Sequence, residues 1–346
     1  MKKLILAAGL VAAPVLVASS AAMAQADCDG IDRPVVFAGL DWDSNSFHNG
    51  IASFILKNGY GCSTESIPGS TIPLLSGMAR GDIDITMEMW IPNVQEAWDK
   101  AEADGDVAEI GVSYPDATQA WYVPKYLVEG DDAKAPDLKS VSDLPKYAEL
   151  FADPEEPGKG RFYNCILGWG CEVFNTKKLQ AYGLLDSFTN FRPGTGGALA
   201  GAIESAILRK RPIVFYYWGP TWVLGKVGDQ IVQLEEPAYD KAIWDKLAST
   251  PVEEVDESFE ATEYPTIKVS IAVNTDFESE APTIVEFLKK YRLDAATVSK
   301  ALAYMQDESA TADEAAQWWM ANNEDIWTKW VPADVAESVK SALSSS

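Results

Sequence analysis

The tryptophans are the residues that stand out for their chemistry: the chain of 346 residues contains twelve of them and a single histidine, His48. One histidine leaves little material for histidine-based acid–base catalysis or metal binding. We therefore expect no catalytic residue, no cofactor and no metal site. Indole rings attract cations to the negative charge of their faces. The composition indicates noncovalent binding of a group that combines positive charge with apolar surface.

Two tryptophans end a pattern that occurs twice: a Pro-Gly turn, a helix-compatible run, a short apolar strand and Trp-x-Pro. The copies run from Pro68 to Pro92 and from Pro193 to Pro220, with 22 and 25 residues from Pro to Trp. Open α/β sheets bind ligands beyond the carboxyl ends of their strands. We expect Trp90 and Trp218 to face each other across a cleft between two similar lobes. The alternative is that both tryptophans lie in the lobe cores.

A third candidate is Trp169, which lies in a short glycine-rich segment flanked by Cys165 and Cys171. A disulfide across this segment would hold the indole rigidly. The backbone N–H groups of Gly170 and Cys171 would then be available to an oxygen of a ligand. The alternative is a disulfide turn with a purely structural role.

Four cysteines in an exported chain predict two disulfides, for which three connectivities exist. Cys165 and Cys171 enclose only five residues, and two of these are glycines that allow a tight turn. This spacing favours a Cys165–Cys171 bridge and makes Cys28–Cys62 its complement.

The first residues are typical of an export signal: Met1-Lys2-Lys3 is basic, an apolar run follows, and Ala22-Met23-Ala24 resembles a cleavage site. We expect residues 1–24 to be a signal peptide and the mature chain to be periplasmic. The residues before Cys28 are not the small apolar run expected before a lipidated cysteine, so no lipid anchor is predicted.

The chain is strongly acidic, with a formal net charge of −24. Nucleic acid and anionic membranes are poor partners for such a surface. A cationic or zwitterionic small ligand is compatible with it, although acidity also serves solubility. We expect a monomer that binds a small molecule and no nucleic acid.

About 320 mature residues exceed what one hydrophobic core usually organises, so two lobes are expected. Apolar runs and helical spacing alternate along the chain, which indicates an α/β fold. The strand candidates are 34–40, 83–89, 213–217 and 267–273, and the helix candidates are 47–57, 199–208 and 283–291.

Several spaced motifs occur in order along the chain. They are Gly39-Leu40-Asp41-Trp42, Gly81-Asp82-Ile83-Asp84, Trp90-Ile91-Pro92, Cys165-x-x-Gly168-Trp169-Gly170-Cys171-Glu172, Pro193-Gly194-Thr195-Gly196 and Tyr216-Tyr217-Trp218-Gly219-Pro220-Thr221-Trp222. Together they resemble the periplasmic substrate-binding proteins of ABC importers for glycine betaine, proline betaine, choline and related osmolytes. The resemblance covers nearly all of the mature chain.

The resemblance implies a two-lobed, type II-like periplasmic binding protein fold with its ligand in a hinge-closing cleft. Lobe 1 would comprise residues 25–124 and 266–346, and lobe 2 residues 125–265. It also implies a membrane permease as partner. Cage positions match Trp90, Trp169 and Trp218 as in the betaine binders and Trp42 as in the choline binders, and Trp121 lies near another aromatic position of the choline binders.

The sequence differs from the family pattern at one position in the stretch after Trp-x-Pro. In well-known betaine binders, a histidine there helps to hold the ligand carboxylate. Here that stretch is Asn93-Val94-Gln95. A ligand with a smaller polar end, such as trimethylamine N-oxide, or with a hydroxyl, such as choline, is therefore a contender beside glycine betaine. Glu129 is the acid that we assign to the site, and Glu88 and Glu172 are further nearby acids by motif position.

The competing class is an exported carbohydrate-binding or glycoside-hydrolysing protein, because tryptophans stack on sugars and paired carboxylates can hydrolyse glycosides. No acid pair is singled out by its spacing, so we expect no enzyme. The remaining tryptophans that we assign to lobe cores or surfaces are Trp98, Trp244, Trp318, Trp319, Trp327 and Trp330.

Overall fold

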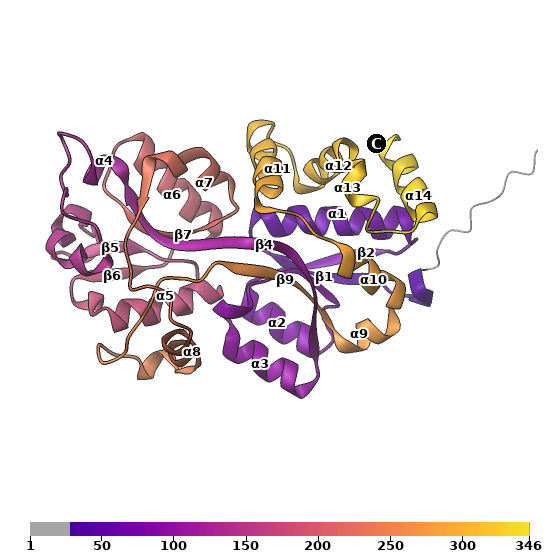
Figure 1. Ribbon diagram of the computed structural model, residues 1–346, viewed down its shortest axis with the longest axis horizontal. Helices are drawn as coiled ribbons and strands as arrows, with labels where there is room; N and C mark the ends of the chain where they lie inside the picture. The colour runs from indigo at the N-terminus through magenta and orange to yellow at the C-terminus, as the bar shows by residue number, and fades with distance from the viewer. Residues whose placement is uncertain (1–27, 346) are drawn as a thin grey trace, which may run out of the picture.

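The computed structural model describes residues 28–345, so the signal peptide predicted at residues 1–24 lies outside the described part. Two lobes lie side by side along the longest axis of the molecule (Figure 1). The strands follow the order β2-β1-β3-β9-β4-β7-β5-β6, with β8 paired to β4. The two-lobed α/β fold predicted from the sequence is therefore confirmed.

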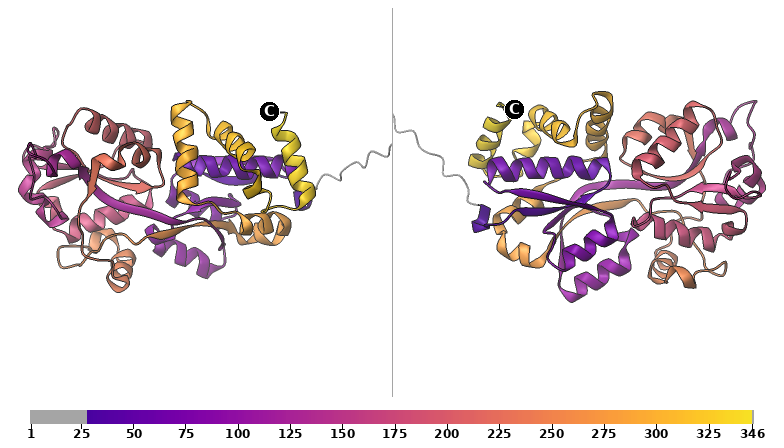
Figure 2. Two further views of the ribbon diagram at one scale, coloured as in Figure 1. Left: turned by 45° about the horizontal axis from the view of Figure 1, so that its top comes forward. Right: turned by 180° about the vertical axis from the view of Figure 1, so that it is seen from behind.

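The first lobe has helices on both faces of its part of the sheet (Figures 1 and 2). Its strands are β1 (Val35–Leu40), β2 (Thr64–Gly69), β3 (Ile85–Met89) and β9 (Ile267–Asn274). Its helices are α1 (Asp43–Gly59), α2 (Thr71–Ala79), α3 (Gln95–Asp104), α9 (Thr275–Glu280), α10 (Pro282–Lys290), α11 (Ala295–Asp307), α12 (Ala312–Asn322), α13 (Glu324–Trp327) and α14 (Ala333–Leu343).

The second lobe is built in the same way around a shorter group of strands. These are β5 (Gly160–Tyr163), β6 (Phe188–Phe191), β7 (Val214–Gly219) and β8 (Ile231–Gln233). Its helices are α4 (Lys125–Val128), α5 (Gly170–Ala181), α6 (Gly196–Leu208), α7 (Trp222–Val227) and α8 (Lys241–Ser249). Short 3₁₀ helices complete the chain: η1 (Cys28–Gly30), η2 (Ile91–Asn93), η3 (Val141–Phe151), η4 (Leu184–Asp186), η5 (Gly228–Gln230) and η6 (Val252–Glu254).

One long strand, β4 (Val107–Pro124), runs from the first lobe into the second (Figure 1). It pairs with β9 as far as Ala117 and with β7 from Thr118 onward. The sequence analysis did not predict this strand. Pro115 and repeated shifts of register interrupt its pattern, and such breaks hide a strand from sequence periodicity. The lobe boundaries at residues 124/125 and 265/266 stay a prediction.

The strands and helices that the sequence did predict occur within a few residues of the expected positions. Helix α1 shows why: Phe47, Ile51 and Ile55 are spaced by four residues and all are fully buried against the sheet and the C-terminal helices. Helix α6 begins at an N-cap, because the side chain of Thr195 accepts a hydrogen bond from the backbone N–H of Ala198. Within residues 28–345, no helix combines the length and apolarity needed to cross a bilayer.

Both predicted disulfides are confirmed. The Cα atoms of Cys28 and Cys62 are 4.9 Å apart, and those of Cys165 and Cys171 are 6.0 Å apart. The first bridge ties the start of the described chain to the end of α1. The second bridge closes the loop that leads into α5.

Removing the two bridges should have unequal effects on stability. The Cys28–Cys62 bridge spans 34 residues and the Cys165–Cys171 bridge spans 6. Loop-closure entropy then predicts that replacing the first pair by serine lowers the free energy of unfolding by about 4 kcal/mol, and the second pair by about 2 kcal/mol. Urea unfolding followed by circular dichroism measures both losses. Equal losses would contradict the entropic explanation.

Candidate functional site

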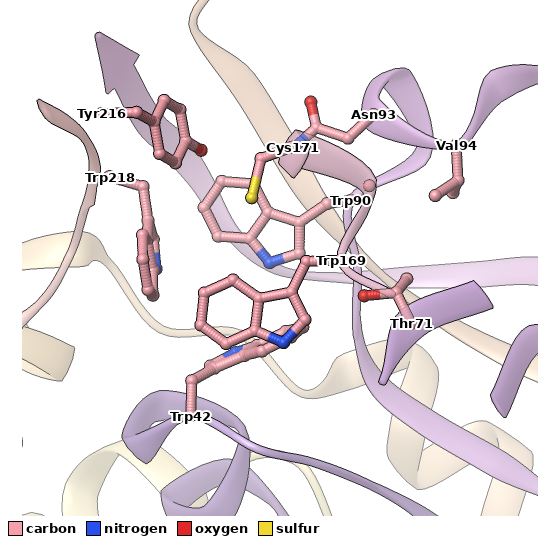
Figure 3. A pocket seen from close by; sticks show the side chains of 10 residues that line it. Trp42, Thr71, Trp90, Asn93, Val94, Trp169, Cys171, Tyr216 and Trp218 are labelled. Atoms are coloured by element: carbon pink, nitrogen blue, oxygen red, sulfur yellow. The ribbon is translucent and has the colours of Figure 1, made fainter. Parts of the chain in front are cut away.

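A cavity lies between the two lobes, and its walls come from both of them (Figure 3). The free volume is about 30 Å³, roughly the space of two water molecules. The residues that line it are Trp42, Thr71, Trp90, Asn93, Val94, Trp169, Gly170, Cys171, Tyr216 and Trp218. Side chains of the two lobes touch across this cavity, so the lobes lie closed on each other here.

Four indoles dominate these walls, and we call Trp42, Trp90, Trp169 and Trp218 the tryptophan cage (Figure 3). Trp90 directly follows β3, and Trp218 is the second-last residue of β7. The ring of Trp169 meets that of Trp42 at 5.3 Å and 81°, and that of Trp218 at 5.2 Å and 88°. These edge-to-face contacts join tryptophans of the two lobes through Trp169.

The loop before α5 fits tightly against the first lobe. Gly168 has a φ of +92°, and its carbonyl accepts a hydrogen bond of 3.3 Å from the backbone N–H of Ile72. A Cβ on Gly170 would lie 2.6 Å from the carbonyl oxygen of Asn93, so only glycine allows this approach. Gly170 is also the first residue of α5, and the N–H groups of a first helical turn have no partner within the helix.

Three of the four indole N–H groups donate to carboxylates rather than into the cavity. Trp42 and Trp90 both donate to Oε2 of Glu88, at 2.8 Å and 3.2 Å. Trp169 donates to Oδ1 of Asp41 at 2.5 Å, across the two lobes. These contacts fix the ring orientations and leave the ring faces as the surface of the cavity.

Glu88, which the sequence analysis named only as a nearby acid, belongs to a buried polar cluster that was not predicted. Its side chain is fully buried, and Oε2 accepts a third hydrogen bond of 3.0 Å from the hydroxyl of Tyr114. Nε2 of His48 lies 3.6 Å from Oε1, and Nδ1 of His48 is 2.5 Å from the hydroxyl of Tyr291. The available signal was the run 83–89, in which the polar residues Asp84, Thr86 and Glu88 occupy every second position of a predicted strand.

Burial shifts the protonation equilibria of this cluster. It raises the pKa of Glu88, while hydrogen bonds from Trp42, Trp90, Tyr114 and the nearby Ser44 act in the opposite direction. Burial also lowers the pKa of His48 to about 3. The imidazole is therefore neutral at physiological pH.

A second polar group closes one side of the cavity. The Asn93 amide donates to Oε1 of Gln119 at 2.7 Å, and the Gln119 amide donates back to Oδ1 of Asn93 at 3.2 Å. The hydroxyl of Tyr216 donates to the same Gln119 oxygen at 2.6 Å. Tyr216 was not among the predicted site residues, but strand alternation places it on the same face of β7 as Trp218.

The structure does not bring two predicted site residues, Trp121 and Glu129, to the cavity. Trp121 lies on β4 opposite Tyr216, but it is fully buried in the second lobe, packs on Phe162 at 4.4 Å and donates to Asn175. Glu129 caps the short helix α4 and is more than half exposed, 3.6 Å from Lys125. We correct both assignments: the first residue supports the lobe core and the second lies on its surface.

The other predicted residues fall into two groups, those that line the cavity and those that do not. The cavity is lined by Trp42, Trp90, Trp169, Gly170, Cys171 and Trp218. Glu172 is buried beside the cavity, where it accepts a hydrogen bond of 2.5 Å from Arg192. Trp98, Trp244, Trp319, Trp327 and Trp330 are buried in the lobes, and Trp318 is 36% exposed. None of these six tryptophans lines the cavity.

The described residues also bear on the alternative of a glycoside-hydrolysing enzyme. Such an enzyme needs two carboxyl groups flanking the substrate. None of the residues described around this cavity is an Asp or a Glu. Within residues 28–345, no cluster of three His, Cys, Asp or Glu side chains is arranged to hold a metal ion. The described lining of this cavity therefore offers no such carboxyl pair.

The fold and this site define a two-lobed substrate-binding protein. Residues 33–322 match the family described as the substrate-binding domain of ABC-type glycine betaine transport systems, and the chain belongs to this family of solute-binding proteins. The chain is 29% identical over 166 residues to the glycine betaine-binding periplasmic protein OusX of Dickeya dadantii (strain 3937), which covers 47% of this chain and 48% of that protein. The match thus spans about half the length of OusX.

A second relative matches over most of its length. The trimethylamine N-oxide-binding protein of Pelagibacter ubique (strain HTCC1062) is 22% identical over 305 residues, which covers 86% of this chain and 90% of that protein. Among solved structures, an ABC-transporter choline-binding protein in complex with choline has a TM-score of 0.70 at 16% identity, covering 91% and 98% of the two chains. Lactococcal OpuAC, closed on glycine betaine, has a TM-score of 0.66 at 20% identity, covering 87% and 100%. These structures share the fold.

The neutral state of His48 can be tested by NMR without overlapping signals, because the sequence contains no other histidine. With a pKa near 3, its imidazole proton resonances should not shift between pH 8 and about pH 5 in an NMR titration. An unfolded histidine takes up a proton near pH 6.5. His48 should therefore contribute stability that is complete above pH 6.5 and lost as the pH falls toward 3. A titration midpoint between pH 5 and 7 in the folded protein would contradict this assignment.

Proposed function

We propose that the chain is the solute-binding component of an ABC importer and captures a methylated ammonium osmolyte, such as glycine betaine, trimethylamine N-oxide or choline, in the tryptophan cage. The observation that carries this proposal is the convergence of four indoles from both lobes on one cavity. A methylated ammonium group spreads its charge over methyl groups and has no N–H to donate. Aromatic faces are therefore better partners for it than carboxylate hydrogen bonds.

The magnitudes support this. Each cation–π contact contributes roughly 0.5–2 kcal/mol, more where water is excluded, and the buried methyl surface adds to it. Micromolar binding requires about 8 kcal/mol. Three or four indoles together with a few polar contacts at the other end of the ligand supply a sum of this size.

The polar end of the cavity favours a ligand with a small oxygen-bearing end. The polar side chains that line it are Thr71, Asn93 and Tyr216, and none of the described lining residues is Lys, Arg or His. The N–H groups of the first turn of α5, at Gly170 and Cys171, and the indole N–H of Trp218 are further donors at the cavity. The names of the two relatives, a glycine betaine-binding and a trimethylamine N-oxide-binding protein, fall within the proposed ligand class.

A larger acidic cavity of about 330 Å³ adjoins the cage on the far side of Trp42, Trp169 and Trp218. Asp41, Asp43 and Glu204 are among the residues that line it. Clefts lined by one sign of charge raise the local concentration of ions of the opposite sign. We assign this cavity to the path along which a cationic headgroup approaches the cage.

Release and capture then follow from lobe movement. The ligand contacts walls from both lobes only when they are closed, so it stabilises the closed state by those contacts. The proposal also includes delivery of the ligand to a membrane permease. It further includes export through residues 1–24, a periplasmic location without a lipid anchor and a monomeric state.

Calorimetry on the mature protein tests the function directly. Titration with glycine betaine, choline, trimethylamine N-oxide and dimethylsulfoniopropionate should give saturable heat with at least one ligand, at a Kd near the micromolar range. Tryptophan fluorescence should change in the same titration, because the ligand contacts indoles. Absence of both signals for the whole panel would remove the proposal.

The Trp169→Ala variant should raise the Kd by about 10- to 100-fold, because it removes one cation–π face together with the contact that joins the lobes. Trp318→Ala is the matched control: Trp318 is partly exposed and stacks on Tyr304 outside the cage. The control should bind like the wild type. An equal effect of both variants would mean that the cage is not the binding site.

A further inference from the structure

Glu88 lies directly behind two walls of the tryptophan cage. Its Oε2 accepts the indole N–H groups of Trp42, at the start of α1, and of Trp90, at the end of β3. The side chain is fully buried and does not line the cavity, so a ligand in the cage would not touch it. Any effect of Glu88 on a ligand must therefore pass through the two indoles or through space.

Among the residues that the structure describes, the hydrogen bonds to this carboxylate all reach Oε2, and Oε1 accepts none. Tyr114 donates to Oε2, and Nε2 of His48 faces Oε1 at 3.6 Å. The hydroxyl of Tyr291 lies 2.5 Å from Nδ1 of His48; when it donates there, Nε2 carries the ring proton toward Glu88. Because burial keeps His48 neutral, no positive charge in this cluster balances an ionised Glu88. Burial raises the pKa of Glu88 and the hydrogen bonds to Oε2 oppose that shift, so a cation supplied from outside the cluster would favour the ionised carboxylate.

We propose that Glu88 is the buried counter-charge of the cage and the residue that makes the cage select a cationic headgroup over a neutral group of the same shape. This inference rests on the proposed function. A negative charge behind the rings attracts a cation in front of them in a medium of low dielectric constant. Hydrogen bonds from the indole N–H groups to a carboxylate also polarise the rings, which increases the negative charge of their faces. A cation in the cage in turn stabilises the ionised form of Glu88.

A merely structural role for Glu88 makes a different prediction. If the carboxylate only orients Trp42 and Trp90, its replacement should weaken binding of charged and neutral ligands by the same factor. If it supplies the counter-charge, the loss should fall on charged ligands. The ratio of the two affinities separates these cases.

The experiment pairs each ammonium ligand that binds with its carbon isostere, in which a quaternary carbon replaces the nitrogen. The pairs are choline with dimethylbutanol, glycine betaine with dimethylbutanoate, and trimethylamine N-oxide with tert-butanol. Affinities are measured by calorimetry at pH 8, by competition where binding is weak, for the wild type, Glu88→Gln and Glu88→Asp. Glu102→Gln is the control, because Glu102 is an exposed acid on α3 of the same lobe.

In Glu88→Gln the preference for the ammonium ligand over its isostere should fall by about tenfold or more, because glutamine keeps an acceptor oxygen and the side-chain shape but loses the charge. Glu88→Asp should bind more weakly yet keep the wild-type preference within about threefold, and Glu102→Gln should keep both. An unchanged preference in Glu88→Gln, or its collapse in Glu88→Asp, overturns the inference. If the wild type binds no ammonium ligand, the proposed function itself fails, which is a separate and recognisable result.

Discussion

The indole of Trp169 lies between the indoles of Trp42 and Trp218, and the closed arrangement of the two lobes is built around these contacts. The ring meets both neighbours edge to face, and its N–H donates to Asp41 of the first lobe. A ring held on three sides has little rotational freedom. The disulfide loop that carries Trp169 limits its freedom further. These contacts of Trp169 therefore define one side of the cavity in this arrangement of the lobes.

The indole side chains of the cage use their N–H edges and their ring faces for different contacts. The N–H edges of Trp42, Trp90 and Trp169 face carboxylates of the protein, and the ring faces are left for the cavity. An indole with an unsatisfied N–H would orient it toward a ligand or water and lose the alignment of its face. The buried Glu88 and the exposed Asp41 thus accept the indole N–H groups and leave the ring faces free for the cavity.

The buried cluster of Glu88, His48, Tyr114 and Tyr291 extends this arrangement from the cage into the core of the first lobe. Its members come from β3, α1, β4 and the residue after α10, so the packing of four segments determines the position of one carboxylate. Such a network transmits the rigidity of the lobe core to the walls of the cavity. It also explains why the single histidine is buried and neutral and does not line the site.

Local motifs of the sequence were sufficient for several features of the site. The repeated Trp-x-Pro pattern placed Trp90 and Trp218, and the spacing of Cys165 and Cys171 gave the rigid loop around Trp169. Each of these features depends on neighbours in the chain: a strand end, a tight turn or a short disulfide loop. The same holds for the two-lobed α/β fold, because strand and helix periodicities are local, and the family resemblance added Trp42.

The tertiary structure alone decided which similar residues reach the cavity. Trp121 and Tyr216 are paired across β4 and β7, yet only Tyr216 lines the cavity, because Trp121 is covered by Phe162 and α5. The sequence contains many acids. Glu88 lies behind two indoles because β3 meets the start of α1 in the folded chain. Distances between segments far apart in the sequence depend on how the lobes pack. Composition and spacing carry no record of that packing, so the sequence indicated the four indoles, whereas the folded chain decided the remaining wall residues and the acids behind the rings.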